Sequence, residues 1–312
     1  IGINTSIGIL IADQACQDVD ELITRADVAL YKAKEAGRGT HAFFADSMTQ
    51  QLRREMEITR ELTQAIQSDE LFLEYQPQFD LHSGALVGME ALVRWHHPRE
   101  GVRQPGAFLP VAEKRGLIRP ISDWVLNAVC RQIRDWSDRG LAFGRIAVNL
   151  CAQQVGDPDF GDNILAVLEH TGACPEYLEL EFTETVLIAA DAQTQADIVR
   201  LSELGIHFAI DDFGTGFSSM QYLRKFRTDK IKIDREFIQD VTHDAGDAEI
   251  VKATIALGTA LGLITIAEGV ETEEQAEFLR RHGCRQVQGY LYGRPQPLAD
   301  IERLIGFGLE TV

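Results

Sequence analysis

The feature that most constrains this 312-residue chain is a regular alternation of short apolar runs with segments long enough for a helix. After Leu71 the apolar runs are rich in Val, Ile and Leu, as strands buried on both faces are. Eight such runs within about 240 residues predict an α/β fold with a closed (β/α)8 barrel, in preference to an open sheet. The runs are LFLEYQPQF, ALVGMEALVRW, RIAVNL, YLELEFTE, HFAIDD, KIKID, ITIAEGV and RQVQGYLYG.

A shorter pattern precedes the barrel. Residues 3–11 and 41–44 predict strands, and the spacing of apolar residues over 19–36 predicts a helix between them. A unit of about 45 residues is small for an independent core. We therefore expect a short β-α-β remnant of a larger domain at the N-terminus.

A charged helix is predicted over residues 47–68, and it carries an apolar stripe. The stripe consists of Leu52, Met56, Leu62 and Ile66. It packs either against its own domain or against a second copy of the chain. The predicted parts are residues 1–46, a linker helix at 47–69 and the barrel domain at 70–312.

Charge and composition limit the classes of partner and the location that we expect for the protein. With 30 basic and 48 acidic side chains the net charge is −18, which argues against polymeric nucleic acid because binding a polyanion needs a basic face. The longest apolar stretch, residues 254–267, is too short to span a bilayer, so we expect no direct membrane insertion. Scattered cysteines without a C-x-x-C pair predict reduced thiols and a cytoplasmic location. The chain begins without Met or a basic segment, which predicts a fragment whose upstream part could carry a membrane anchor.

Polar side chains recur at the ends of the apolar runs, spaced by the length of a strand plus a helix. In a (β/α)8 barrel all strand C-termini meet at one mouth, so we expect these side chains to converge. Singly, each has a plainer interpretation, since an acid after a strand commonly caps a helix or is solvated. Lys232, between Ile231 and Ile233, faces either the barrel or the solvent. The set comprises Glu90, Asn149, Glu181, Asp211, Asp212, Lys232, Glu268 and Gln288.

The five carboxylates in this set would repel one another and lose hydration, which raises their pKa values or requires cations. With the amide of Asn149 and no His or Cys nearby, an all-oxygen ligand set favours Mg²⁺ or Mn²⁺ over zinc. The adjacent Asp211 and Asp212 can serve two ions, an arrangement that suits in-line attack on a phosphodiester. The hexapeptide 211–216 alone also fits a tight turn capped by Asp.

The motif order over residues 70 to about 300 resembles the EAL domain, the family of cyclic di-GMP phosphodiesterases. The motifs are Glu90-Ala91-Leu92, Val148-Asn149-Leu150, ELEFTE from Glu179, DDFGTGFSS from Asp211, Lys232-Ile233-Asp234, AEGVE from Ala267 and Gln288-Gly289-Tyr290. The resemblance implies a modified (β/α)8 barrel, TIM-like, with one antiparallel strand, and a homodimer.

The N-terminal part has a resemblance of its own. The words SIGI and ADVALYKAKEAGRGTHAF resemble the C-terminal tail of a GGDEF diguanylate cyclase domain. The GGDEF turn itself does not occur in the sequence, so no cyclase activity is expected from these residues.

Residue roles follow from the EAL resemblance. Two ions, Mg²⁺ or Mn²⁺, are implied: the first is held by Glu90, Asn149, Glu181 and Asp211, and the second by Asp211, Asp212 and Glu268. Lys232 is implied to orient the attacking water or to help deprotonate it. The implied substrate-binding residues are Arg94, Gln76, Gln288 and Asp234. Glu184 is implied to anchor the DDFGTGFSS loop, and Glu271 to support the site from behind the ligands.

The implied reaction opens cyclic di-GMP to linear pGpG, with two-metal activation of a water for in-line attack. We expect a hydrolase of bacterial second-messenger signalling, since degenerate members of the family usually lose the signature Glu or the Asp pair, and Glu90, Asp211 and Asp212 are all present. The alternative is a non-catalytic cyclic di-GMP receptor that signals through the linker helix. A third interpretation, an unrelated metal-dependent barrel hydrolase, leaves the motif order as coincidence.

Overall fold

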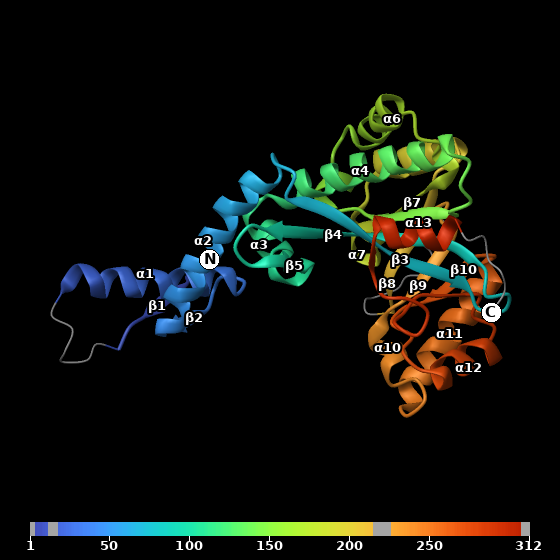
Figure 1. Ribbon diagram of the computed structural model, residues 1–312. Coiled ribbons are helices and arrows are strands. Elements are labelled where there is room, and N and C mark those ends of the chain that lie inside the picture. The colour runs from blue at the N-terminus through green and yellow to red at the C-terminus, as the bar shows by residue number, and fades with distance from the viewer. Residues whose placement is uncertain (1–3, 12–17, 215–225, 307–312) are drawn as a thin grey trace.

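This computed structural model describes residues 4–11, 18–214 and 226–306. Within these ranges a barrel of strands is surrounded by helices, and the N-terminal part projects from it along one long helix (Figure 1). The barrel strands are β3 (Leu71–Asp80), β4 (Leu86–His97), β6 (Arg145–Asn149), β7 (Leu178–Thr183), β8 (His207–Phe213), β9 (Lys230–Ile233), β10 (Ile264–Ala267) and β11 (Gln286–Val287).

Strand pairing closes these eight strands into a ring. Their order is β3-β11-β10-β9-β8-β7-β6-β4, and β4 returns to β3. Strand β3 is antiparallel to both of its ring neighbours, whereas the other neighbouring pairs in the ring are parallel. The predicted α/β barrel with one antiparallel strand is therefore confirmed. Two short strands extend the sheet, β5 (Gly101–Arg103) beside β4 and β12 (Gln296–Pro297) beside β3.

Helices cover the outside of the ring, and the longer ones bury apolar side chains spaced at helical intervals. On α4 (Ile118–Asp138), for example, Ile121, Val125, Val129 and Ile133 are buried at helical spacing. The other helices are α3 (Leu109–Arg115), α5 (Ala152–Val155), α6 (Phe160–Thr171), α7 (Glu184–Ala189), α8 (Ala192–Glu203), α10 (Arg235–Gln239), α11 (Ala245–Leu261), α12 (Glu273–Arg281) and α13 (Leu298–Gly306), with 3₁₀ turns at Pro105–Ala107 and Pro175–Tyr177. In the part of the chain described, no helix is both long and apolar enough to cross a bilayer.

The N-terminal part has the predicted strand, helix and strand. Strands β1 (Ile7–Ile9) and β2 (His41–Phe43) pair in parallel in a sheet separate from the barrel. Helix α1 (Val19–Glu35) connects them in sequence, and α2 (Asp46–Ala65) leads on to β3.

The apolar stripe predicted on α2 is wrong in one position. Met56 is 61% exposed, while Glu55 beside it is 4% exposed and takes the inward side. The reason is charge: the Glu55 carboxylate lies 3.7 Å from Lys32 of α1, and 3.2 Å from Lys114 and 3.5 Å from Arg115 of α3. Basic side chains on two neighbouring helices thus stabilise an inward-facing acid on α2.

Candidate active site

The polar side chains predicted to converge do meet at one end of the barrel, which we call the mouth. Most of them lie at or near the C-terminal ends of parallel strands, or on the residue that follows, whereas Glu90 lies within the long strand β4 beside Ala147 of β6. Glu90 lies in β4, Glu181 in β7, Lys232 in β9, Asp211 and Asp212 near the end of β8, Asn149 at the end of β6, Glu268 after β10 and Gln288 after β11.

The backbone after Gln288 passes very close to the loop that contains Val270. A Cβ on Gly289 would lie 2.1 Å from the carbonyl oxygen of Val270, so only glycine fits at this position.

The Lys232 ammonium lies at the centre of the mouth. Its Nζ is 2.5 Å from Glu181 Oε2, 2.6 Å from Glu268 Oε1 and 3.1 Å from Asp211 Oδ1. Glu90 Oε2 is 3.8 Å away. Lys232 is 1% exposed and lies among these carboxylates. Of the two predicted directions, barrel or solvent, it takes the first and faces the barrel interior.

One ammonium does not balance these carboxylates. Burial lowers the pKa of Lys232, but Asp211, Glu181 and Glu268 around it outweigh that effect, and its pKa is raised. Burial raises the pKa of Glu181 well above its usual range despite Lys232. Burial likewise raises the pKa of Glu268 to about 8. The mouth therefore has a deficit of positive charge.

The two adjacent aspartates lie on an irregular stretch of β8. The pairing of β8 with β9 shifts register between Ile210 and Phe213, and Asp212 adopts a left-handed backbone with φ of 53°. The Asp212 amide donates to Asp211 Oδ1 at 3.0 Å. Such bulges re-aim side chains next to active sites. Burial, followed by the charge of Asp211 and interactions with Asp234, raises the pKa of Asp212 to about 7.

Amide donors hold both oxygens of Glu90. Asn149 Nδ2 donates to Oε1 at 2.7 Å, and Gln288 Nε2 donates to Oε2 at 2.6 Å. Gln288 Nε2 also donates to Gln76 Oε1 at 3.1 Å, while Gln76 Nε2 donates to the Gly293 carbonyl at 3.0 Å. Because its nitrogen faces Glu90, the Asn149 amide turns its oxygen the other way.

The donor set at the mouth fits a hard divalent cation. It consists of carboxylate and amide oxygens, and the buried Oε1 of Glu181 has no hydrogen-bond partner among the described residues. The side chains are arranged around the Lys232 ammonium and not around a metal ion. Within the described ranges, no three Asp, Glu, His or Cys residues are spaced to share an ion. Binding a divalent ion would require these carboxylates to turn from Lys232 toward it.

Of the other predicted substrate-binding residues, Arg94 lies outside this cluster, whereas Asp234 interacts with Asp212 of the cluster. Arg94 is buried further along β4, where its Nε donates to Glu74 Oε2 at 2.7 Å and its Nη1 to the Val93 carbonyl at 3.0 Å. Asp234 follows β9 and caps α10, accepting from the Glu236 amide at 2.6 Å. The capping role considered for strand-end acids therefore applies to Asp234.

The two residues predicted to support the site differ from each other. Glu184 is buried and begins α7 directly after β7. The loop it is predicted to anchor continues into residues 215–225, which lie outside the described ranges. Glu271 is more exposed, and its carboxylate pairs with Arg235 at 2.9 Å.

A second polar layer under the mouth was not predicted. It consists of Gln78, Lys230 and Glu179, all buried inside the ring, and we call it the floor layer. The sequence carried a signal for it: Gln76 and Gln78, Lys230 and Lys232, and Glu179 and Glu181 are pairs two residues apart on three strands. Residues with that spacing share one face of a strand, so each pair points into the barrel together.

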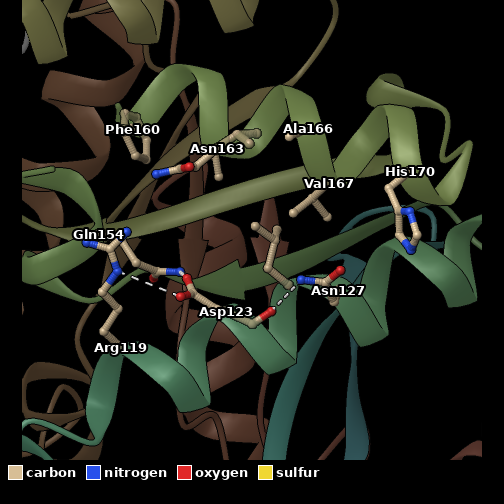
Figure 2. A pocket seen from close by; sticks show the side chains of 11 residues that line it. Arg119, Asp123, Asn127, Gln154, Phe160, Asn163, Ala166, Val167 and His170 are labelled. Atoms are coloured by element: carbon tan, nitrogen blue, oxygen red, sulfur yellow. Dashed lines mark hydrogen bonds and ion pairs between the residues drawn. The ribbon is translucent and has the colours of Figure 1, made fainter. Parts of the chain in front are cut away.

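A cavity of about 330 Å³ lies elsewhere, between α4 and α6 on the outside of the ring (Figure 2). Asp123 and Asn127 of α4 face Asn163 and Val167 of α6 across it. None of the mouth residues lines it. The cavity and the mouth are therefore separate, and the converging polar side chains make the mouth the candidate site.

Comparison with known proteins agrees with this geometry. The model of the EAL domain family matches residues 59–295. The bifunctional diguanylate cyclase/cyclic di-GMP phosphodiesterase MucR of Pseudomonas aeruginosa is 43% identical over 297 residues, which cover 95% of this chain and 43% of that protein. The cyclic di-GMP phosphodiesterase PdeR of Escherichia coli is 36% identical over 300 residues, covering 96% of this chain and 45% of PdeR. The chain thus spans less than half the length of these relatives.

Solved structures have the same fold. The PaMucR phosphodiesterase in complex with c-di-GMP superposes with a TM-score of 0.75 at 44% identity, covering 78% of this chain and 99% of that one. The EAL enzyme Bd1971 in its cAMP and cyclic-di-GMP bound form gives a TM-score of 0.77 at 29% identity, covering 93% of this chain and 77% of that one. This chain belongs to the EAL domain family.

Proposed function

We propose that this chain is a cyclic di-GMP phosphodiesterase that hydrolyses its substrate to linear pGpG at the barrel mouth. The observation that carries the proposal is the convergence of Glu181, Asp211 and Glu268 on Lys232, with Glu90 held beside them. An excess of buried carboxylate at one end of a barrel is suited to divalent ions and an anionic ester. Support comes from the relatives that bear the name cyclic di-GMP phosphodiesterase.

The proposed cofactor is a pair of Mg²⁺ or Mn²⁺ ions, and EAL phosphodiesterases in general are metal-dependent. When bound, such ions lower the pKa of a water and stabilise charge on the phosphoryl oxygens. The residues that would hold them are Glu90, Asn149, Glu181, Asp211, Asp212 and Glu268.

The other residues bind and orient. The raised pKa of Lys232 keeps its ammonium charged while the carboxylates around it are charged, so it orients the attacking water by donating to its oxygen. Gln288 donates to Glu90 and holds it, and Gln76 accepts from Gln288, so both present amide groups at the mouth. For Arg94 to bind a phosphate, its guanidinium must share its donors with Glu74.

Product analysis tests the proposal. The purified chain is incubated with cyclic di-GMP and Mg²⁺, Mn²⁺ or EDTA, and the products are separated by chromatography. We expect pGpG with either ion and none with EDTA. Measurable binding of cyclic di-GMP without pGpG in both Mg²⁺ and Mn²⁺ would replace the proposal with the receptor function.

The remaining assignments stay proposals. We infer that residues 1–46 are the tail of a GGDEF-like domain, 47–69 a linker helix and 70–312 the EAL domain. The match to MucR over 95% of the chain supports this, because MucR is named as both cyclase and phosphodiesterase. Homodimer formation through the EAL domain and a cytoplasmic location also remain predictions.

A further inference from the structure

The floor layer contains an ion pair that is closed off from solvent. Lys230 Nζ lies 2.6 Å from Glu179 Oε1, and the two side chains are 3% and 1% exposed. Lys230 Nζ also donates to Gln78 Oε1 at 3.2 Å. Gln78 Nε2 in turn donates to Gln288 Oε1 at 2.9 Å. A continuous hydrogen-bonded chain therefore runs from the floor layer to Gln288 and on to Glu90 at the mouth.

The groups at the two ends of this hydrogen-bonded network, Lys230 and Glu90, determine which way each hydrogen bond in it points. An ammonium can only donate, so the Gln78 amide must turn its oxygen to Lys230 and its nitrogen upward. Gln288 must then accept from Gln78 with its oxygen, and its nitrogen faces Glu90, whose carboxylate can only accept. Without Lys230 at the lower end, the Gln78 amide could reverse and turn its oxygen toward the oxygen of Gln288. Gln288, whose nitrogen Gln76 and Glu90 hold from above, would then lose the hydrogen bond that positions it from below.

Stability alone does not account for the Lys230–Glu179 pair. Two charges removed from water lose hydration energy that their mutual attraction barely repays, and apolar residues of similar volume often serve a core as well. The order of side chains along the network instead matches a positioning role, since each residue fixes the next one up to a proposed metal ligand.

We propose that Lys230, held by Glu179, is a positioning residue of the reaction: through Gln78 it fixes the orientation of Gln288, which then holds Glu90 in place for metal binding. The inference rests on the proposed function and names residues of the same barrel that the family resemblance did not. A residue that orients a metal ligand through hydrogen bonds typically affects metal affinity or activity by about 10- to 100-fold.

Two variants test it. Gln78→Leu removes the link and leaves the Lys230–Glu179 pair intact. The double variant Lys230→Met/Glu179→Met removes both charges and leaves Gln78 free to reverse, without stranding a buried charge. For both we expect Mn²⁺ affinity, measured by calorimetry, to fall about tenfold, and kcat at saturating Mn²⁺ to fall about tenfold while KM for cyclic di-GMP stays within about twofold.

The matched control is Gln286→Leu. Gln286 is buried on β11, two residues from Gln288, and within the described ranges its Oε1 has no hydrogen-bond partner. This variant makes the same chemical change in the same barrel and removes no hydrogen bond of the network, so we expect Mn²⁺ affinity and kcat to match the unmodified protein. Circular dichroism and Tm establish that each variant is folded.

The outcomes separate the two proposals. If the unmodified protein binds Mn²⁺ but forms no pGpG, the proposed function fails, while the comparison of Mn²⁺ affinities still decides the positioning role. If folded Gln78→Leu or the folded double variant keeps full Mn²⁺ affinity and kcat, the positioning role of Lys230 is overturned. It is also overturned if Gln286→Leu loses as much as Gln78→Leu, because the effect would then be general to buried glutamines.

Discussion

Lys230 and Lys232, two residues apart on β9, lie in opposite electrostatic environments. Lys232 at the mouth has three carboxylates within 3.1 Å and a fourth at 3.8 Å. Lys230 in the floor layer has one carboxylate and one amide oxygen, and Arg145 lies 3.8 Å from the other oxygen of that carboxylate. Both side chains are fully enclosed by the barrel, so burial does not distinguish them.

The balance of charge distinguishes them. In the floor layer Lys230 already matches the single carboxylate, and Arg145 lies beside it, so this layer gains nothing from a further cation. The mouth has more negative than positive charge, and the raised pKa values of Glu181 and Glu268 express that imbalance. A divalent ion should therefore act on one layer and leave the other unaffected.

The largest expected effect is on turnover. Glu90→Ala removes a proposed metal ligand that two amides hold in place. Since a bound metal supplies several kcal/mol of transition-state stabilisation, we expect Mg²⁺-dependent hydrolysis to fall by about 10³-fold or more with Tm little changed. The control is Glu277→Ala, a half-exposed acid on α12 that pairs with Arg280 and Arg281 and should keep full activity. Normal hydrolysis by Glu90→Ala would contradict the assignment of the metal site.

The next effect is on the stability of the floor layer. Lys230→Met leaves Glu179 buried without its ammonium, at a cost of about 3–5 kcal/mol and a fall in Tm of about 10 °C. Mg²⁺ should not restore this loss, because the floor layer lies below the proposed ligands. Adding Glu179→Met should recover most of it, as measured by thermal unfolding in Mg²⁺ and in EDTA. Full recovery by Mg²⁺ alone would remove the distinction between the layers.

Lys232→Met should respond in the opposite way. Its removal leaves the mouth carboxylates without a counter-ion, although some of them can take up protons, so we expect a smaller fall in Tm of about 5 °C in EDTA. Saturating Mg²⁺ should restore Tm, since a divalent ion supplies the missing charge. A loss of Tm that is equal in EDTA and Mg²⁺ would mean that the mouth does not bind the ion.

The smallest effect is a pH dependence of stabilisation by Mg²⁺. In the metal-free protein the pKa of Asp212 is raised to about 7 and that of Glu268 to about 8. A carboxyl group whose pKa is raised on folding contributes stability at low pH, and this is lost as pH rises through the folded pKa. Mg²⁺ binds the deprotonated forms, so its effect on Tm should grow by about 3 °C between pH 6 and pH 8.5. A shift in Tm that is equal at both pH values would contradict the raised pKa values.

The sequence predicted the barrel and most of the mouth because both depend on simple periodicities. Alternating strands and helices implied the ring, and Asn149, Glu181 and Asp211 recur at intervals that bring strand ends together. The direction of Lys232 could not be predicted, since it depends on which face of β9 the closed ring turns inward. The partner of Arg94 was missed because Glu74 reaches it across an antiparallel pair whose register is known only from the fold.

The floor layer shows a different limit of sequence interpretation. Its residues were visible as polar pairs at a spacing of two, but Gln78 and Lys230 each have an ordinary alternative on the solvent side of a strand. Only ring closure, which places Gln78 between Lys230 and Gln288, turns those pairs into a connected network.

The antiparallel strand β3 determines when this site can form during synthesis. It pairs with β4 within one hairpin but also with β11, and the Gln78–Gln288 hydrogen bond joins residues 210 positions apart. Contacts between such distant residues form late, because a long loop must close first. A nascent chain that has passed Glu268 but not Gln288 holds all five carboxylates of the mouth in an open ring. Catalytic competence should therefore arise in a single step when β11 leaves the ribosome and closes the barrel.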